Sequence, residues 1–239
     1  MIVSNIPGTT RDAIDSPLKY YGKEYLLIDT AGIRKKSKVS YGIELFSVVR
    51  AFKAIERADI VLLVISADEG VTEQEQRLAG FIQEKGKPCI IVINKWDLIK
   101  NKDSSTQNKF TNDIKRDLYF IDYAPLLFTS ALTKKRLFNV FKMIDNIVQE
   151  ANKRISTGLL NKVINEAVAL NPPAFKKGKT GRIYYSTQAT SNPPIFILFV
   201  NNKDLFDETY RRYLENKLRE SFGFQGIPIK IIFRNKEKD

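Results

Sequence analysis

Four short polar motifs follow one another along the chain, and each could close a loop around a bound molecule. The first two are PGTTRD at residues 7–12 and DTAG at residues 29–32. The other two are NKWD at residues 94–97 and SAL at residues 130–132. Each of the last three comes directly after an apolar run with the composition of a strand. Because open α/β sheets bind ligands at the C-terminal ends of their strands, the four motifs together predict one binding site.

The NKWD motif carries the most particular chemistry of the four. The carboxylate of Asp97 can accept two parallel hydrogen bonds, which matches the N1–H and the 2-amino group of guanine. Adenine has no 2-amino group and would leave this carboxylate unpaired, and a site built on such hydrogen bonds discriminates by about 10⁴–10⁵. Lys95 can lay its stem over the base, and Asn94 can tie neighbouring loops together. The motif therefore predicts a guanine reader, with a plain surface turn as the structural alternative.

The DTAG and SAL motifs are weak signals when each is taken alone. Asp29 can hold a magnesium shell through water, and Gly32 lets the backbone approach a terminal phosphate because no Cβ obstructs it. An Asx-type turn after a strand is the structural alternative for DTAG. The backbone amides of residues 130–132 could meet the 6-oxo group of guanine. The order of all four motifs makes the joint pattern specific.

Alternating strands and helices must position these motifs in the first part of the chain. Apolar residues recur at helical spacing over 43–57, and Thr72 with Glu75 predicts a capping box at the start of a helix. The apolar runs at 60–66 and 89–94 are typical of strands that are buried on both faces of a parallel sheet. The remaining predicted elements are a hairpin of 18–22 and 24–29 that turns at 22–23, helices at 72–85, 106–118 and 137–153, and a strand at 126–130. This order predicts an α/β fold with a parallel sheet.

The pattern changes after residue 153 and indicates a second, smaller domain. Its predicted elements are helices at 157–168 and 208–222 and strands at 181–189, 194–202 and 227–233, which make a compact α+β unit. Residues 153–239 carry 16 Lys and Arg against 8 Asp and Glu, whereas residues 1–152 carry 23 against 19. The denser positive charge points toward a polyanion such as nucleic acid, with a solvated basic face as the alternative.

Composition excludes several classes of site and of protein. The 239 residues contain no His, which rules out imidazole metal ligands and Ser-His-Asp triads. The single cysteine, Cys89, rules out an internal disulfide and lies in an apolar run that predicts a buried thiol. No apolar run reaches the roughly 18 residues that span a bilayer, and the N-terminus lacks the order of a signal peptide. These observations indicate a soluble protein from a reducing compartment.

Taken together, the motifs resemble the G2 to G5 elements of translation-factor-type GTPases, and in detail the second GTPase domain of the Der (EngA) family. The runs that carry this resemblance are VSNIPGTTRDAIDSP, DTAGIRKKSKV, SVVRAFKAIERADIVLLVISADEGVTEQEQRLAG and INKWDLI. The later runs TGLLNKVINEAVALNPP, RIYYSTQA, PIFILFVNN and RRYLENKLRESFGFQGIPIKI are similar to the KH-like domain of that family. The resemblance covers essentially the whole chain. It implies an α/β G domain of the P-loop-NTPase type at 1–153, followed by a smaller α+β KH-like domain at 154–239 that binds RNA or the ribosome.

The resemblance also assigns metal ligands. It implies that Thr10, in the switch segment, and Asp29 hold Mg²⁺ beside the phosphates. Thr9 and the backbone oxygens of Ser4 and Ile6 fall in the loop that relatives use for a potassium ion. The segment PGTTRD is therefore expected to close over the metal and the γ-phosphate.

Catalysis and nucleotide binding are assigned in the same way. Many GTPases have a water-positioning glutamine directly after DTAG, but this chain has Ile33, which cannot orient water. The family is grouped with GTPases whose hydrolysis relies on the potassium ion instead. The residues implied for catalysis are Thr9, Thr10 and Gly32, and those implied for binding GTP and GDP are Asp29, Thr30, Ala31, Gly32, Ile33, Asn94, Lys95, Trp96, Asp97, Ser130, Ala131 and Leu132.

One element of the family pattern is not found in the sequence. No G-x-x-x-x-G-K-[ST] phosphate loop precedes DTAG, and the Gly-Lys-Thr at 178–180 has Pro173 where the first glycine should be. We therefore expect a partial sequence that lacks the first strand, the P-loop, the first helix and an earlier GTPase domain of the same protein. That strand would lie between the strands ending at Asp29 and Ser66. Without phosphate contacts worth about 1.5–3 kcal/mol each, this chain alone is expected to hydrolyse GTP poorly.

The resemblance implies a GTP-hydrolysing factor in the biogenesis of the large ribosomal subunit, with ribosomal RNA as its partner and no membrane. Its implied location is the bacterial cytoplasm or the plastid stroma. The alternative is a nucleotide-free fragment that docks on RNA through residues 153–239. The intact NKWD motif speaks against this alternative, because a pure RNA binder has no use for a guanine reader.

Overall fold

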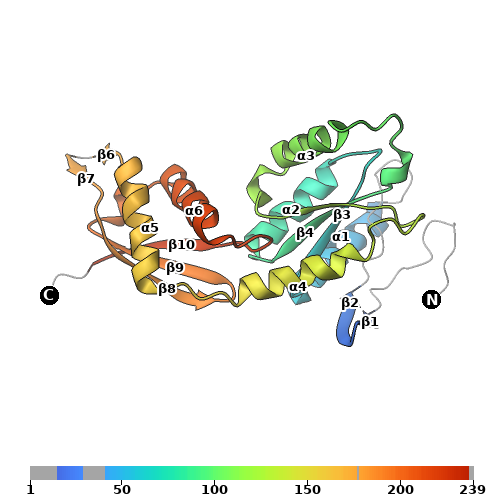
Figure 1. Ribbon diagram of the computed structural model, residues 1–239, viewed down its shortest axis with the longest axis horizontal. Coiled ribbons are helices and arrows are strands. Elements are labelled where there is room, and N and C mark those ends of the chain that lie inside the picture. The colour runs from blue at the N-terminus through green and yellow to red at the C-terminus, as the bar shows by residue number, and fades with distance from the viewer. Residues whose placement is uncertain (1–14, 29–40, 177, 237–239) are drawn as a thin grey trace.

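The computed structural model describes residues 15–28, 41–176 and 178–236. Two bodies of helix and strand follow each other along the chain, with α4 leading from the first to the second (Figure 1). No helix in the described ranges is long and apolar enough to cross a membrane. The predicted site residues that lie outside the described residues are Ser4, Ile6, Thr9, Thr10, Asp29, Thr30, Ala31, Gly32 and Ile33.

The first domain is a parallel sheet between helices. Its elements are β1 (Asp15–Tyr20), β2 (Lys23–Ile28), α1 (Tyr41–Arg57), β3 (Val61–Ser66), α2 (Glu73–Glu84), β4 (Cys89–Asn94), η1 (Trp96–Leu98), α3 (Thr106–Asp117), η2 (Tyr119–Ile121), β5 (Leu126–Phe128) and α4 (Asn139–Ala151). The three strands of the sheet run parallel in the order β3-β4-β5. Residues of α2 and α3 pack on one face of β4, and residues of α4 pack on the other. The predicted α/β fold with a parallel sheet is confirmed.

Two local predictions in this domain are confirmed. The N–H of Thr72 donates to Glu75 Oε2 at 3.0 Å, which forms the backbone half of the capping box that starts α2. Cys89 is fully buried at the start of β4. Burial raises the pKa of its thiol to about 12, so this group stays neutral and packs as a small apolar side chain.

β3 contradicts the expectation that the run at 60–66 is buried on both faces. Leu62 is 36% exposed and Val64 is 54% exposed, whereas Leu63 and Ile65 between them are buried. The reason is that Leu62 and Val64 belong to neither buried cluster of the first domain, so their side of the strand has no described cover. Among the described residues β3 is an edge strand, and β2 pairs only with β1. β2 and β3 thus belong to separate sheets within the described residues, and the strand expected between them stays a prediction.

The hairpin of β1 and β2 packs on α4 and turns one residue earlier than predicted. Its turn residues are Tyr21 and Gly22, with φ of 45° and 75°, because Lys23 already pairs with Tyr20. The rings of Tyr20 and Phe141 stack with centroids 4.1 Å apart. Lys23 Nζ lies 2.7 Å from Asp145 Oδ1. These contacts attach the hairpin to the same helix that covers one face of the sheet.

The second domain is an α+β unit, as predicted. It consists of α5 (Thr157–Leu170), β6 (Phe175–Lys176), β7 (Lys179–Thr180), β8 (Ile183–Ser191), β9 (Pro194–Val200), η3 (Lys203–Leu205), α6 (Glu208–Phe222) and β10 (Lys230–Asn235). β9 lies between β8, which is antiparallel to it, and β10, which is parallel to it. Alternate residues of these strands form one buried cluster with α5 and α6. The Gly-Lys-Thr at 178–180 lies in the small β6–β7 hairpin, so it is not a phosphate loop.

The loop between α6 and β10, residues 223–229, docks against the first domain at the N-terminal end of its sheet. The N–H of Cys89 donates to the carbonyl of Gly226 at 2.9 Å, and the N–H of Gly226 donates to the carbonyl of Tyr123 at 2.8 Å. Ile227 is fully buried in one cluster with residues of β4, β5 and α4. The first residue of β4 is therefore hydrogen-bonded to the second domain.

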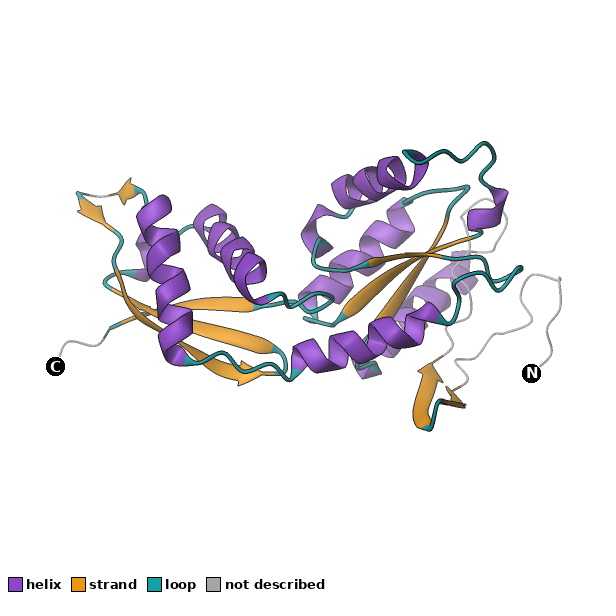
Figure 2. Ribbon diagram, in the orientation of Figure 1, coloured by secondary structure: helices purple, strands orange, loops and turns teal. Residues whose placement is uncertain are grey.

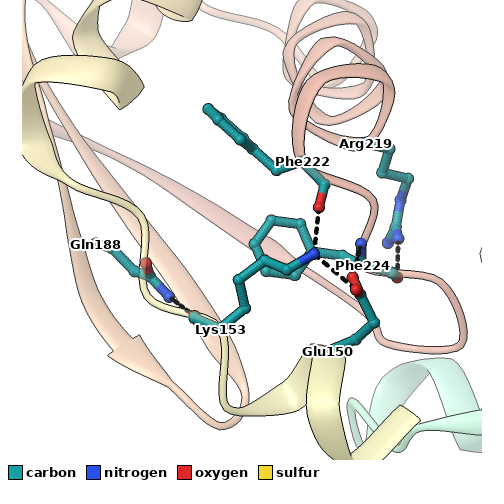
Figure 3. Close-up of polar contacts among 6 residues, drawn as sticks. All are labelled: Glu150, Lys153, Gln188, Arg219, Phe222 and Phe224. Atoms are coloured by element: carbon teal, nitrogen blue, oxygen red, sulfur yellow. Dashed lines mark hydrogen bonds and ion pairs between the residues drawn. The ribbon is translucent and has the colours of Figure 1, made fainter. Parts of the chain in front are cut away.

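Polar side chains close this junction on the side of α4 (Figure 3). Glu150 Oε2 accepts a hydrogen bond from the N–H of Phe224 at 2.6 Å. Lys153 Nζ donates to the carbonyl of Phe222 at 2.7 Å and pairs with Glu150 at 2.6 Å. Arg219, on α6, donates to the carbonyl of Phe224 at 2.8 Å. The end of α4 thus holds backbone groups of the loop that would otherwise be buried without partners.

Candidate functional site

The candidate site lies at the C-terminal end of the parallel sheet, where the chain leaves β4 in a sharp turn. Ser66 at the end of β3 is level with Asn94 at the end of β4. The N–H of Ala67 donates to the carbonyl of Asn94 at 2.9 Å. Lys95 follows in the left-handed conformation, with φ of 57°. This turn directs the residues after Asn94 away from the sheet and into the 3-10 helix η1.

Asn94 links the NKWD loop to the SAL loop. Its side-chain Oδ1 accepts a hydrogen bond from the N–H of Ala131 at 3.0 Å. The two loops come from positions 37 residues apart in the sequence. The amide thus fixes the separation between the predicted guanine reader and the backbone predicted to meet the 6-oxo group.

Trp96 anchors the NKWD loop to the core. Its backbone N–H donates to the carbonyl of Thr129 at 3.1 Å. Its indole contacts the rings of Phe110, 5.0 Å away, and Phe128, 4.6 Å away, both in edge-on geometry. Lys102 Nζ lies 5.4 Å from the centre of the indole. The resemblance groups Trp96 with the nucleotide-binding residues, but the structure directs its ring into the protein, where it holds the loop in place.

Asp97 lies in η1 and is exposed. Within the described residues no group donates a hydrogen bond to its carboxylate and no cation pairs with it. A carboxylate on an anchored loop with both oxygens available can accept two parallel hydrogen bonds from a ligand. Asp97 is therefore free to accept such hydrogen bonds, and its assignment as a guanine reader stays a prediction.

The SAL loop is anchored on its buried side and exposed to solvent on its other side. Ser130 is only 2% exposed, and its Oγ accepts a hydrogen bond from the N–H of Thr133 at 3.1 Å. Thr129 Oγ1 donates to the carbonyl of Lys135 at 2.9 Å. Leu132, by contrast, is 84% exposed. Of the three predicted residues, Ser130 therefore supports the loop, Ala131 donates its N–H to Asn94, and Leu132 lies at the surface.

Asp68 is a charged neighbour of the site that the sequence reading missed. Its Oδ1 lies 3.7 Å from Lys95 Nζ and accepts a short hydrogen bond from the hydroxyl of Ser66. The Ser66 hydrogen bond is the main reason that the pKa of Asp68 lies below its usual value, and Lys95 adds to the effect. The signal in the sequence is an acidic residue two positions after the end of β3, at the same sheet edge as NKWD.

The structure brings together two of the four motifs, NKWD and SAL, and places Ser66 and Asp68 beside them. PGTTRD and DTAG lie outside the described residues. In the described part of the chain no group of three acidic or Cys side chains is close enough to hold a metal ion. The assignments of Thr10 and Asp29 to Mg²⁺, and of Ser4, Ile6 and Thr9 to potassium, therefore stay predictions.

Comparison with known proteins identifies relatives for both domains. Residues 1–95 match the family described as a 50S ribosome-binding GTPase. Residues 154–234 match the C-terminal KH-domain-like family of EngA bacterial GTPase enzymes. The GTPase Der of Synechococcus sp. (strain JA-3-3Ab) is 56% identical over 238 residues, which are 99% of this chain and 52% of that protein. The GTPase Der of Thermoanaerobacter sp. (strain X514) is 54% identical over 231 residues, 97% of this chain and 52% of that protein.

Among solved structures, the chain resembles Era in complex with MgGDPNP and nucleotides 1506–1542 of 16S ribosomal RNA. The TM-score is 0.51 at 19% sequence identity, and the match covers 98% of this chain and 83% of that one. Agreement at this level of identity shows a shared fold across both domains. The chain spans about half the length of the curated relatives it matches.

Proposed function

The chain belongs to the Der (EngA) family of GTPases, and on that basis we propose that it binds guanine nucleotides and contributes to GTP hydrolysis during ribosome biogenesis. The observation that carries the proposal is the Asp97 carboxylate, which is exposed and without a partner among the described residues on a loop fixed through Asn94 and Trp96. Guanine supplies two donors in the geometry that this carboxylate accepts, and adenine does not. Lys95 covers the base with its stem. The backbone N–H of Leu132 meets the 6-oxo group, because the N–H groups of Ser130 and Ala131 already donate within the protein.

The phosphate side of the site is proposed to come from the segments around PGTTRD and DTAG. Thr10 and Asp29 would hold Mg²⁺, Thr9 with the backbone oxygens of Ser4 and Ile6 would hold potassium, and these cations would supply positive charge to the phosphoryl group as it transfers. The backbone at Gly32 would approach the γ-phosphate, flanked by Thr30, Ala31 and Ile33. The absence of a glutamine at position 33 favours hydrolysis that depends on the potassium site.

We propose that the two domains have separate roles. Residues 1–153 would read and hydrolyse the nucleotide, and residues 154–239 would dock on ribosomal RNA of the large subunit, in the bacterial cytoplasm or the plastid stroma. The charge of the second domain supports an RNA partner, with 16 basic against 8 acidic residues over 153–239. A second candidate function is that of an RNA-docking chain that binds no nucleotide, which the charge of the second domain would support by itself.

Base recognition can be tested with the chain as it stands. In saturation-transfer NMR with GDP and ADP at about 1 mM, a concentration suited to weak binding, we expect signal transfer to guanine protons and little to adenine protons. Equal transfer to both bases would contradict the guanine reader. No transfer to either base would favour the nucleotide-free fragment.

Hydrolysis can be tested in a chimera that places the phosphate-loop segment of a Der relative before residue 1. We expect GTP turnover that is faster in potassium than in sodium chloride, since sodium is too small for the proposed site. Turnover that is indifferent to the cation would remove the potassium assignment but leave the guanine assignment intact. A chimera that binds guanine nucleotides in NMR but never hydrolyses them would reject the catalytic proposal.

A further inference from the structure

The sheet of the second domain has one covered face and one open face. Residues Phe196, Leu198 and Val200 of β9 are fully buried against α5 and α6. Figure 2 shows both helices on the same side of β8, β9 and β10. The alternate residues of the strands point to the other side, where they are half-buried or exposed. We call this side the open sheet face; its outward residues include Tyr185, Ile195, Ile197, Phe199, Ile232 and Arg234.

A pair of stacked aromatic rings lies on the open sheet face, across β8 and β9. Tyr185 of β8 is directly opposite Phe199 of β9. Their rings stack with centroids 4.3 Å apart and planes 15° from parallel. Tyr185 is 43% exposed, so one side of the stack remains accessible. The neighbouring Tyr184 is 47% exposed as well. Flat aromatic rings that stay accessible on a sheet are suited to stacking with another planar group.

Charge on the three strands of the open sheet face is of one sign. The three strands contain no Asp or Glu, whereas β10 carries Lys230 and Arg234, both exposed. Lys236 follows β10, with its Nζ 5.5 Å from the centre of the Tyr184 ring. Within the described residues none of these three cations has a carboxylate partner. An accessible aromatic surface bordered by unpaired cations fits a ligand that has both flat rings and negative charges.

We propose that the open sheet face binds unpaired RNA, with a base stacked on the accessible side of the Tyr185–Phe199 pair and phosphates beside Arg234, Lys230 and Lys236. The proposal rests on the RNA partner of the proposed function and specifies where and how that RNA binds. Single-stranded bases can leave their own stack and lie on aromatic rings, while bases in a duplex cannot. Cations along the strand neutralise phosphates without reading sequence. The surface should therefore prefer single-stranded over double-stranded RNA and show little base preference.

The test is the affinity of the full chain for a fluorescein-labelled single-stranded oligouridylate of about 12 nucleotides, measured by anisotropy. We expect Tyr185→Ala to weaken binding by about tenfold, because one stacked base loses its platform. Tyr185→Trp should restore affinity, which a merely structural role would not require. Arg234→Gln should lower the slope of log affinity against log salt by about one, the share of one phosphate contact. Tyr21→Ala is the matched control, because Tyr21 is 89% exposed on the first domain.

Each other outcome overturns the proposal in a distinguishable way. If the chain binds the oligouridylate and Tyr185→Ala binds as well as the unaltered chain, the RNA site lies elsewhere and the proposed RNA partner survives. If a duplex of the same length binds as tightly as the single strand, the contact is only electrostatic. If no RNA binds, the RNA partner fails together with this surface, while the GDP experiment still decides the GTPase. If sedimentation shows a dimer that Tyr185→Ala dissociates, the face is an interface between two copies of the chain.

Discussion

The two ends of the first domain's sheet differ in burial and in hydrogen bonding to the second domain, although the same strands run between them. At the C-terminal end, Asp97 and Leu132 are exposed on loops that hydrogen bonds of Asn94, Trp96 and Ser130 hold in place. At the N-terminal end, Cys89 is fully buried and bonded to the loop 223–229 of the second domain. One end therefore leaves polar groups free at the surface, and the other is tied to the second domain. β4 connects the two ends, because Cys89 is its first residue and Asn94 its last.

The largest effect is expected at the exposed end, from Asp97→Ala. The variant removes two charge-assisted hydrogen bonds to guanine, each worth about 1.5–3 kcal/mol, so the preference for GDP over ADP should fall by roughly 10²–10⁴. Competition experiments in the chimera with a phosphate loop would measure it. Thermal stability should not change, because the side chain makes no hydrogen bond or ion pair within the described residues. If the variant keeps its preference for GDP over ADP, Asp97 does not read guanine, and the exposed end of the sheet loses its proposed ligand.

At the buried end we expect the largest loss of stability from Gly226→Ala. Gly226 has a φ of 77°, and a Cβ there would lie 2.4 Å from Ile147 Cδ1. The combined backbone strain and overpacking should lower the free energy of unfolding by about 2–4 kcal/mol. The matched control is Gly86→Ala, at a φ of 60° with nothing within 4 Å of the added Cβ. It should cost only about 1 kcal/mol. Equal losses in urea denaturation would mean that the junction is not tightly packed.

Asn94→Ala tests whether the link between the two loops matters for binding. The change removes the acceptor for the Ala131 N–H, so the guanine reader and the SAL backbone lose their fixed separation. One such hydrogen bond is worth about 0.5–1.5 kcal/mol, and GDP affinity should fall by about threefold to tenfold. Asn152→Ala is the control, because its side chain bonds only within the last turn of α4. An unchanged GDP affinity in Asn94→Ala would show that the loops hold their places independently.

The smallest effect concerns the pH dependence of the junction. Glu215 lies on α6, and burial raises its pKa to about 7, although the nearby Arg219 acts in the opposite direction. Glu208 on the same helix and Asp122, which follows η2, raise it further, and Arg211 lowers it. The folded protein therefore binds a proton more tightly than the unfolded chain. Its contribution to stability is complete below about pH 4.5 and is lost as the pH rises through about 7.

Glu215→Gln should remove this pH dependence. Relative to the unaltered chain, the variant should gain in melting temperature between pH 5 and pH 8, because it has no buried carboxylate to ionise. Glu220→Gln, at an exposed position of the same helix, should show no such gain. If the melting temperatures of all three proteins change equally between the two pH values, Glu215 does not cause the pH dependence.

The fold was more accessible to sequence reasoning than the site. Local chemistry specified β4, α2 and α6, since an all-apolar run, a capping box and an amphipathic stripe each point to one structure. The exposed face of β3 was not predictable, because an apolar run gives no information about which of its sides finds cover. Asp68 was missed for a related reason. Its role depends on the registration of β3 beside β4, which places it near Lys95 and which no single motif encodes.

The junction was also absent from the sequence reading, for a physical reason. Gly226 and Ile227 look like an ordinary turn before a strand, and nothing near them shows that Cys89 and Tyr123 will supply their hydrogen-bond partners. Such contacts depend on two domains that each fold first by their own patterns. Trp96 is a second example, since its place inside a nucleotide motif does not indicate that its ring packs against Phe110 and Phe128. Its assignment to nucleotide binding stays a prediction.

The edge of β3 bears on how this chain behaves in concentrated solution. Leu62 and Val64 present apolar surface beside a row of backbone groups that no described strand pairs with. Edges of that kind recruit strands from neighbouring molecules. Samples kept at high concentration should accordingly grow turbid with time, and a lysine at position 64 should keep them clear.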